Sequence, residues 1–245
     1  MNLDTRLWGV LPAAGIGRRM GSEVPKQYLT LHGRTVLGHA IARLADHPDM
    51  AGVVVAIAAD DPYWPQAAPD LAIPVETVTG GGERCHSVLH ALERLAGYAD
   101  PDDWVLVHDA ARPCLPATDL ARLVAAVRGH PGGGLLAQRM HDTVKRAVAG
   151  GDEVAETVDR SRLWRAQTPQ MFRLGALRAA LRAALDAGTL VTDESSAMEA
   201  VGDRPLLVEG SPENIKVTRP EDLALAGFYL GRDAGHGTGE PERAQ

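Results

Sequence analysis

The sequence predicts an α/β fold with a mainly parallel sheet that helices cover on both faces. Short runs rich in Val, Ile and Leu alternate along the chain with longer segments whose apolar residues recur at the helical period. These runs are apolar at nearly every position, which is typical of parallel strands buried on both faces. A chain of 245 residues buries enough apolar surface to need no disulfide or metal for its stability.

The first half of the chain repeats this strand and helix pattern. Leu7–Pro12 is a short apolar run and predicts the first strand. The apolar residues of Thr35–Asp46 recur at the 3.6-residue period, so this segment is expected to be a helix. Further strands are expected at Val53–Ala58 and Pro74–Val78, and a second helix at Glu83–Ala96.

The alternation continues in the second half of the chain. Trp104–His108 predicts a fourth strand, and Thr118–Arg128 predicts a helix with Thr118 as its N-cap. Two more strands and a closing helix are expected at Gly133–Ala137, Pro205–Val208 and Glu221–Leu230. In a sheet of this kind ligands bind beyond the carboxyl ends of the strands, so candidate functional residues are sought there.

The segment His141–Val158 departs from this pattern. Charged and alternating β-prone residues flank the Gly150-Gly151 pair, which predicts a protruding β-hairpin arm. A polar hairpin with no packing surface of its own is a candidate dimer contact. The spacing agrees equally well with a surface insertion that has no partner.

Composition excludes several classes of protein. The formal net charge of −7 argues against a nucleic-acid-binding protein, because such binding needs a basic face. No secretory signal and no run of about 18 apolar residues is visible, so a cytoplasmic protein without a membrane span is expected. Cys85 and Cys114 fit reduced thiols better than a disulfide or a zinc site. A single domain is expected over residues 1–231, and a disordered tail over 232–245.

The most informative motif follows the first strand. Residues 12–21 read Pro-Ala-Ala-Gly-Ile-Gly-Arg-Arg-Met-Gly, and Pro-Lys-Gln-Tyr follows at 25–28. The dinucleotide fingerprint fails because Met20 stands where its third Gly is needed, and no P-loop Gly-Lys-Ser/Thr is present. Small residues at a strand end still allow successive backbone N–H groups to hold phosphate oxygens. Arg19 and Lys26 would suit a triphosphate, although a tight turn followed by solvated basic residues has the same pattern.

Two other segments carry candidate binding groups. The fourth strand delivers Asp109 to its carboxyl end, where a carboxylate can hold Mg²⁺, although an Asp that caps a turn occurs in the same setting. Gly80-Gly81-Gly82 precedes a predicted helix, and its backbone could approach a nucleobase or ribose. By itself this loop is more typical of an ordinary helix start.

Other reactive residues form no recognisable catalytic motif. His86 and His90 have a metal-ligand spacing, but no adjacent Glu and no third ligand is evident. Ser195 lacks the Gly-x-Ser-x-Gly elbow of a nucleophilic serine. Asn214–Thr218 alternates like a strand. Spacing alone cannot bring together the other candidate cations and hydroxyls, which are Thr143, Lys145, Arg160, Thr168, Thr192 and Lys216.

These motifs together resemble the 2-C-methyl-D-erythritol 4-phosphate cytidylyltransferase family, whose members use CTP in the non-mevalonate isoprenoid pathway. The resemblance runs in order from about residue 8 to 231. Its most specific parts are Thr-Val-Asp-Arg at 157–160, Thr-Pro-Gln at 168–170 and Asn-Ile-Lys-Val-Thr at 214–218. The glycine-rich loop alone would indicate only the wider nucleotidyltransferase superfamily.

The resemblance implies a Rossmann-like, three-layer nucleotidyltransferase fold with a mixed sheet. It also implies a homodimer in which each β-arm, here about residues 138–160, helps to build the other subunit's site. By matched position, Arg19 and Lys26 would stabilise the transition state, and Arg160 and Lys216 would position the methylerythritol phosphate. The same pocket would be lined by Asp109, Arg112, Thr143, Thr168 and Thr192. The cytidine nucleotide would contact Ala13, Ala14, Gly15, Gly17, Gly81 and Ser87.

The expected reaction joins CTP and 2-C-methyl-D-erythritol 4-phosphate with the help of Mg²⁺ or another divalent cation. A phosphate oxygen would attack the α-phosphorus in line, without a covalent intermediate. A phosphomonoester is already mostly dianionic at neutral pH, so no general base is needed. Two alternatives are a ribitol 5-phosphate cytidylyltransferase and a non-catalytic nucleotide-binding regulator. Gly82 stands where some relatives carry Asp, which leaves the selectivity for CTP open.

Overall fold

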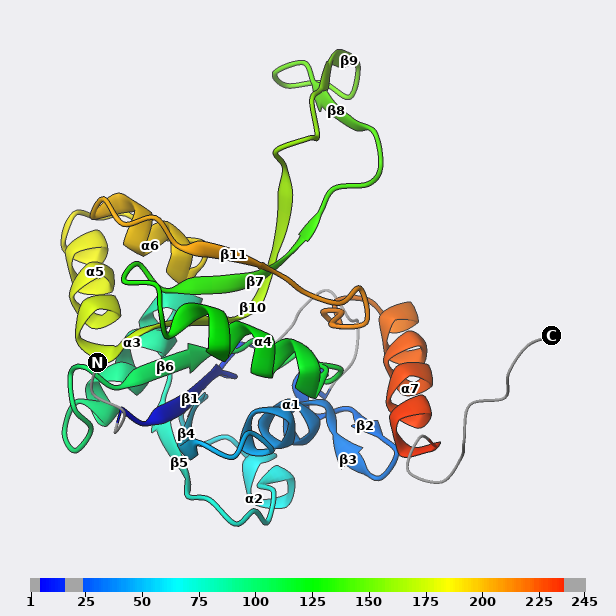
Figure 1. Ribbon diagram of the computed structural model, residues 1–245. Helices are drawn as coiled ribbons and strands as arrows, with labels where there is room; N and C mark the ends of the chain where they lie inside the picture. The colour runs from blue at the N-terminus through cyan, green and yellow to red at the C-terminus, as the bar shows by residue number, and fades with distance from the viewer. Residues whose placement is uncertain (1–4, 16–23, 236–245) are drawn as a thin grey trace.

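The protein is described here by a computed structural model that covers residues 5–15 and 24–235. The strands of the main sheet are β1 (Leu7–Pro12), β4 (Met50–Ile57), β5 (Val75–Thr79), β6 (Trp104–Val107), β7 (Gly134–Arg139), β10 (Trp164–Arg173) and β11 (Leu206–Glu209). They lie in the order β11-β7-β10-β6-β1-β4-β5 (Figure 1). All neighbouring pairs that exclude β10 are parallel, which confirms the predicted mainly parallel sheet.

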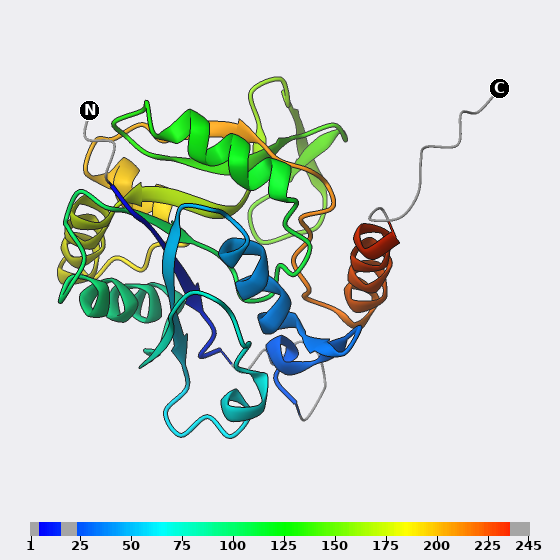
Figure 2. The same ribbon diagram turned by 60° about the horizontal axis from the view of Figure 1, so that its bottom comes forward.

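Helices cover both faces of this sheet and make three layers. One face is covered by α1 (Val36–Ala45) and α4 (Ala117–Val127). The other face is covered by α3 (Arg84–Leu95) and α5 (Leu174–Asp186), with α6 (Glu194–Ala200) packed on α5 (Figures 1 and 2). The predicted layer arrangement is therefore confirmed.

The side chains of β1 show why the strand sequences are apolar throughout. Leu7 and Leu11 join the core beneath α1 and α4, whereas Trp8 and Val10 join the core beneath α3 and α5. All four side chains are buried. Since successive residues of a strand point to opposite faces, a strand covered on both sides needs apolar residues at every position.

β10 runs antiparallel to both of its neighbours, β6 and β7, and the sequence did not predict it. Its first half is polar and it contains Pro169, a residue that argues against a strand inside a sheet. The pairing with β7 changes register between Ala166 and Gln170, and this irregularity accommodates the proline. Because Gln170 pairs with Val107 at the end of β6, the preceding residues of β10 lie at the carboxyl edge of the parallel strands.

The segment between β7 and β10 extends away from the sheet as an arm (Figure 1). It carries a small antiparallel hairpin made of β8 (Val144–Ala147) and β9 (Val154–Val158). Most of its side chains are exposed, including Val154 at 61%. A hairpin thus occurs in the segment where the sequence indicated one, and its surface is open to solvent.

A short hairpin follows the loop after β1. The 3-10 turn η2 (Lys26–Tyr28) leads into β2 (Thr30–Leu31), which pairs antiparallel with β3 (Arg34–Thr35). The turn residues His32 and Gly33 have φ angles of 47° and 78°. A two-residue hairpin turn with positive φ at both positions matches the twist of its strands, and Gly is favoured there because it lacks a Cβ.

Several boundaries differ from those expected. α4 begins at Ala117 with Pro116, not Thr118, at the N-cap position, because the Pro116 carbonyl accepts the first helical hydrogen bonds, from the N–H groups of Asp119 and Leu120. Asn214–Thr218 forms no strand; its Val217 N–H donates to the Ala111 carbonyl instead.

The last helix of the chain is longer than expected. α7 (Pro220–Gly235) continues five residues beyond the expected end at Leu230 and packs against β2. Residues 236–245 of the expected tail lie outside the described residues.

A short helix, α2 (Trp64–Ala67), joins β4 to β5. Within the described ranges no helix has the length and apolarity needed to cross a membrane.

Candidate active site

The carboxyl ends of β1 and β6 border a cavity of about 680 Å³. The start of α3 forms another part of its wall, so three segments that are distant in sequence meet at the edge where ligands were expected. The lining residues are Pro12, Ala13, Ala14, Gly15, Lys26, Gln27, Gly81, Gly82, Glu83, Arg84, Ser87, Asp109, Ala110, Ala111 and Lys216.

Gln27 holds the described part of the loop after β1. Its side-chain Nε2 donates to the Ala13 carbonyl at 2.7 Å and to the Gly15 carbonyl at 2.9 Å. Gln27 itself is buried, so the two bonds are shielded from solvent. The small residues 13–15 are therefore held at the cavity wall. These are residues that were predicted to contact the nucleotide.

Lys26 reaches the same cavity from η2. Its Nζ donates to the backbone carbonyl of Val217 at 2.8 Å, which joins the loop after β1 to the segment that carries Lys216. The structure thus brings two of the predicted cations, Lys26 and Lys216, to one cavity. Gly17 and Arg19, predicted for the same site, lie outside the described residues.

The glycine-rich loop before α3 approaches the loop after β1 closely. A Cβ atom at Gly80 would lie against Ala14 and only 2.8 Å from Ser87 Oγ, so glycine is needed there. The Gly81 N–H donates to the Ser87 hydroxyl at 3.0 Å, and both residues line the cavity. A Cβ at Gly82 would meet nothing within 4 Å, so this position has room for a side chain.

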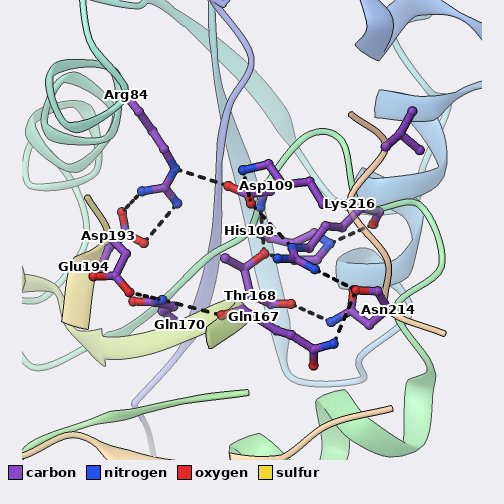
Figure 3. Close-up of polar contacts among 12 residues, drawn as sticks. Arg84, His108, Asp109, Gln167, Thr168, Gln170, Asp193, Glu194, Asn214 and Lys216 are labelled. Atoms are coloured by element: carbon purple, nitrogen blue, oxygen red, sulfur yellow. Dashed lines mark hydrogen bonds and ion pairs between the residues drawn. The ribbon is translucent and has the colours of Figure 1, made fainter. Parts of the chain in front are cut away.

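Asp109 is the centre of a charged cluster (Figure 3). Its Oδ1 accepts from Arg84 Nε at 3.1 Å, and its Oδ2 accepts from Lys216 Nζ at 2.9 Å and from Arg112 Nε at 3.4 Å. The residue is only 7% exposed. Burial alone would raise the pKa of its carboxyl, but the nearby charges of Arg84 and Lys216 outweigh burial and hold that pKa well below its usual range. Asp109 is therefore ionised at neutral pH.

Arg84 connects this carboxylate to a second buried acid, Glu194 at the start of α6. Its Nη1 and Nη2 donate to the two Glu194 oxygens at 2.6 and 3.1 Å. The Glu194 side chain is 1% exposed. Burial lowers the pKa of Arg84, but the two carboxylates outweigh burial and raise it above its ordinary value. Sequence reasoning missed this pair; the available signal was an arginine close behind the glycine-rich loop.

The cluster has more positive than negative charge. The carboxylates of Asp109 and Glu194 are outnumbered by the cations of Arg84, Arg112 and Lys216. Arg84 directs Nε, Nη1 and Nη2 at the two carboxylates. The Lys216 side chain, in contrast, is 42% exposed and lines the cavity. The excess positive charge can attract an anion, and Lys216 is placed to contact it.

Thr168 and His108 connect Asp109 to the loop that follows it. The Asp109 N–H donates to Thr168 Oγ1 at 3.0 Å, and that oxygen lies 2.9 Å from His108 Nδ1. His108 Nε2 lies 3.0 Å from the Arg112 carbonyl. Complete burial lowers the pKa of His108 to about 4, so the imidazole is neutral at pH 7. Thr168, predicted to line the substrate pocket, is buried and contacts Asp109.

Other predicted site residues lie apart from the cavity wall in this chain. Thr143 and Arg160 are exposed on the arm, and Thr192 is exposed just before α6. None of the three is among the residues that line the cavity. Arg112 is also absent from the wall, but it contacts Asp109, and its Nη1 donates to the Asn214 carbonyl at 2.7 Å. The single chain therefore assembles only part of the predicted substrate pocket.

The remaining reactive side chains have local partners. His86 completes a capping box with Glu83 at the start of α3, and His90 lies 2.9 Å from the Thr79 carbonyl. The Ser195 hydroxyl donates to Glu199 at 2.6 Å. Among the residues that the structure describes, no three His, Cys, Asp or Glu side chains are grouped to hold a metal ion. The thiols of Cys85 and Cys114 are both buried.

A cavity at the carboxyl edge of a mainly parallel sheet, with two glycine-rich loops and excess cations, defines a nucleotide-binding enzyme site. The profile of 2-C-methyl-D-erythritol 4-phosphate cytidylyltransferases matches residues 7–232. The chain belongs to this family, and it is thus a cytidylyltransferase, one kind of nucleotidyltransferase.

Similar proteins cover nearly the whole chain. The 2-C-methyl-D-erythritol 4-phosphate cytidylyltransferase of Ectopseudomonas mendocina is 55% identical over 233 residues, which are 94% of this chain and 99% of that relative. The enzyme of the same name from Pseudomonas entomophila is 57% identical over 88% of this chain and 92% of its own length. The crystal structure of the Francisella tularensis cytidylyltransferase has a TM-score of 0.78 at 36% identity, covering 92% of this chain and all of that one.

Proposed function

We propose that this protein transfers CMP from CTP to 2-C-methyl-D-erythritol 4-phosphate, giving 4-diphosphocytidyl-2-C-methyl-D-erythritol and pyrophosphate. The observation that carries the proposal is one cavity that combines the small-residue loops after β1 and before α3 with Lys26 and Lys216. Small residues and exposed backbone N–H groups suit a nucleotide, and the cations suit the phosphates. The names of the relatives supply the particular polyol phosphate.

The reaction requires two anions to approach each other. An oxygen of the polyol phosphate forms a bond to the α-phosphorus of CTP. The bond from that phosphorus to the bridging oxygen of the β-phosphate breaks, and its electron pair leaves with pyrophosphate. The nucleophile has no proton to lose, because a phosphomonoester is mostly dianionic near pH 7. Catalysis then depends on positioning and on stabilisation of negative charge.

The proposed roles follow the geometry of the cavity. The loop residues 13–15, with Gly17, would contact the CTP phosphates and sugar, and Gly81 and Ser87 would contact its nucleoside. Lys26 would stabilise charge on the triphosphate as pyrophosphate leaves, and the same role is proposed for Arg19 from its sequence motif. Lys216 would position the incoming phosphate, because its ammonium group is exposed to the cavity and is oriented by Asp109.

The donor set does not fit a Mg²⁺ ion held by the protein alone. Asp109 is the predicted ligand, but its two oxygens already accept from Arg84, Arg112 and Lys216. A divalent cation would fit this cavity as a partner of the triphosphate, with phosphate and water oxygens as its main ligands. We therefore assign Asp109 to orienting the cations around it.

The proposal is tested by measuring pyrophosphate release from CTP and MgCl₂, with 2-C-methyl-D-erythritol 4-phosphate and ribitol 5-phosphate in parallel. Release with the methylerythritol phosphate alone is expected. A preference for ribitol phosphate would keep the chemistry and overturn the substrate. Folded protein that binds CTP and releases pyrophosphate with neither substrate would point to a nucleotide-binding regulator instead.

We also propose that the arm completes the substrate site of a second copy in a homodimer. The arm is solvent-exposed in the single chain, and Arg160, which follows β9, is exposed and is not among the residues that line its own cavity. A guanidinium suits bidentate contact with a phosphate, so Arg160→Ala is expected to raise the KM for the polyol phosphate more than the KM for CTP.

The shared site can be tested by mixing the two impaired variants at a concentration of polyol phosphate well below the KM of Arg160→Ala. Heterodimers of Arg160→Ala and Lys26→Ala contain one site with both intact residues if Arg160 acts across the interface. Partial recovery of turnover is expected in purified heterodimers that carry two different affinity tags. Heterodimers with no more activity than the mean of the two separate variants would contradict a contribution from the partner subunit.

A further inference from the structure

We propose that His108 is a positioning residue. Its neutral imidazole, with hydrogen on Nε2, holds Asp109 and Arg112 in place within the charged cluster centred on Asp109. This inference rests on the proposed function, since it assigns a role in the same site. It concerns a residue that has no direct access to substrate, because His108 is completely buried.

One hydrogen bond of His108 has only one possible direction, and for a neutral ring it decides the direction of the other. The Arg112 carbonyl can only accept, so the Nε2 atom 3.0 Å away must carry the hydrogen. A neutral imidazole then presents a lone pair at Nδ1, which accepts from the Thr168 hydroxyl at 2.9 Å. The same hydroxyl oxygen accepts from the Asp109 N–H at 3.0 Å.

These bonds join three separate segments next to the cavity, which carry His108, Thr168 and Asn214 (Figure 3). The Asn214 side chain donates to the Thr168 carbonyl at 2.8 Å, and Arg112 Nη1 donates to the Asn214 carbonyl at 2.7 Å. His108 closes the remaining gap between Thr168 and the Arg112 backbone. A closed ring of this kind fixes the end of β6 and its following loop relative to β10 and the segment that carries Lys216.

Histidine is suited to this place because it offers one acceptor and one donor on opposite sides of a rigid ring. Removal of the ring would leave the Arg112 carbonyl and the Thr168 hydroxyl buried without their partner, which is costly in a low-dielectric interior. The side chains of Asn and Gln are shorter or more flexible, and each can reproduce one of the two bonds. They can therefore separate the contribution of each bond.

The kinetic test compares His108→Leu, His108→Asn and His108→Gln with the wild-type enzyme. His108→Leu is expected to lower kcat/KM for the polyol phosphate on the order of 10²-fold, because small misplacements of catalytic groups have effects of this size. The KM for CTP is expected to stay near the wild-type value, since the hydrogen bonds of His108 go to Val10, Arg112 and Thr168 and not to the described nucleotide-loop residues 13–15 and 80–82. His108→Asn and His108→Gln are expected to keep activities between those of His108→Leu and the wild type.

A matched control is His130→Gln. His130 Nδ1 lies 3.1 Å from the Gly133 carbonyl, before β7, at the edge of the sheet opposite the cavity. Loss of this histidine tests the general effect of removing an imidazole bonded to backbone, and kinetic constants like those of the wild type are expected. Normal kinetics in all folded His108 variants, or Asn and Gln variants as inactive as His108→Leu, would overturn the proposal.

A measurement that is independent of activity uses nitrogen NMR of the histidine-labelled wild-type enzyme. His108, assigned by comparison with His108→Gln, is expected to show a protonated Nε2 and an unprotonated Nδ1 at pH 7. Hydrogen on Nδ1 would overturn the proposal even if the variants were too unstable to assay. Wild-type enzyme with the expected tautomer but no pyrophosphate release would overturn the proposed function and leave the hydrogen-bond assignment intact.

Discussion

Replacing Lys26 by alanine is expected to lower kcat by about 10²–10³-fold, as is typical when one preorganised charge-stabilising group is lost. Lys26 lies at the cavity and is held by the Val217 carbonyl, so its charge is already oriented before substrate binds. A charge that acts mainly in the transition state affects kcat more than substrate affinity. The measurement is steady-state pyrophosphate release with both substrates saturating.

Arg94→Ala is the matched control for the loss of a cation. Arg94 lies in the last turn of α3, far along the helix from the cavity, and pairs with Glu76 on the surface. Its replacement is expected to leave kcat close to the wild-type value. Near-normal turnover in a folded Lys26→Ala enzyme would remove Lys26 from the mechanism.

Replacing Asp109 by asparagine is expected to lower the free energy of unfolding at pH 7 by about 3 kcal/mol, the typical cost of breaking a buried ion pair. Asn keeps the shape of the side chain but removes the carboxylate with which Arg84, Arg112 and Lys216 pair. Urea denaturation followed by far-UV circular dichroism measures the difference. Asp49→Asn is the control, because its pair with Arg128 is solvent-exposed and is expected to contribute less than about 1 kcal/mol.

The stability difference at Asp109 is also expected to depend on pH. The pKa of this carboxyl is lower in the folded protein than in the unfolded chain, so ionisation stabilises the fold above the unfolded pKa of about 4. The wild-type advantage is lost progressively as pH falls from about 4 toward the lower folded pKa, where both states become protonated. A difference between wild type and Asp109→Asn that stays constant between pH 7 and pH 3 would contradict this account.

The parts of the fold that the sequence predicted well are those decided by local pattern. Leu7–Pro12 was predicted with its observed bounds, because a strand buried on both faces is apolar throughout. The helix predicted over Thr35–Asp46 is α1, whose observed caps are these two end residues, for a similar reason: one buried face imposes the 3.6-residue period. These signals lie within a few residues and need no knowledge of the rest of the chain.

β10 shows where local pattern was insufficient. Its polar first half and its proline argue against a strand, yet it occupies the interior of the sheet between β6 and β7. The polar residues are accommodated because they lie at the functional edge, where Thr168 contacts Asp109 and His108. α6 was missed too, although Asp193 and Ser196 form a capping box at its start.

The sequence by itself determined the layered fold, the loops at the strand ends, the cations Lys26 and Lys216 as candidates, and through its motifs the family. Only the tertiary structure decided which of these groups meet. Arg84 and Glu194 are 110 positions apart, and Arg84 reaches both Glu194 and Asp109 because folding brings the starts of α3 and α6 close to the end of β6. The physical reason is that periodicity and spacing report local backbone geometry, whereas the charge balance of a site depends on side chains that only folding brings together.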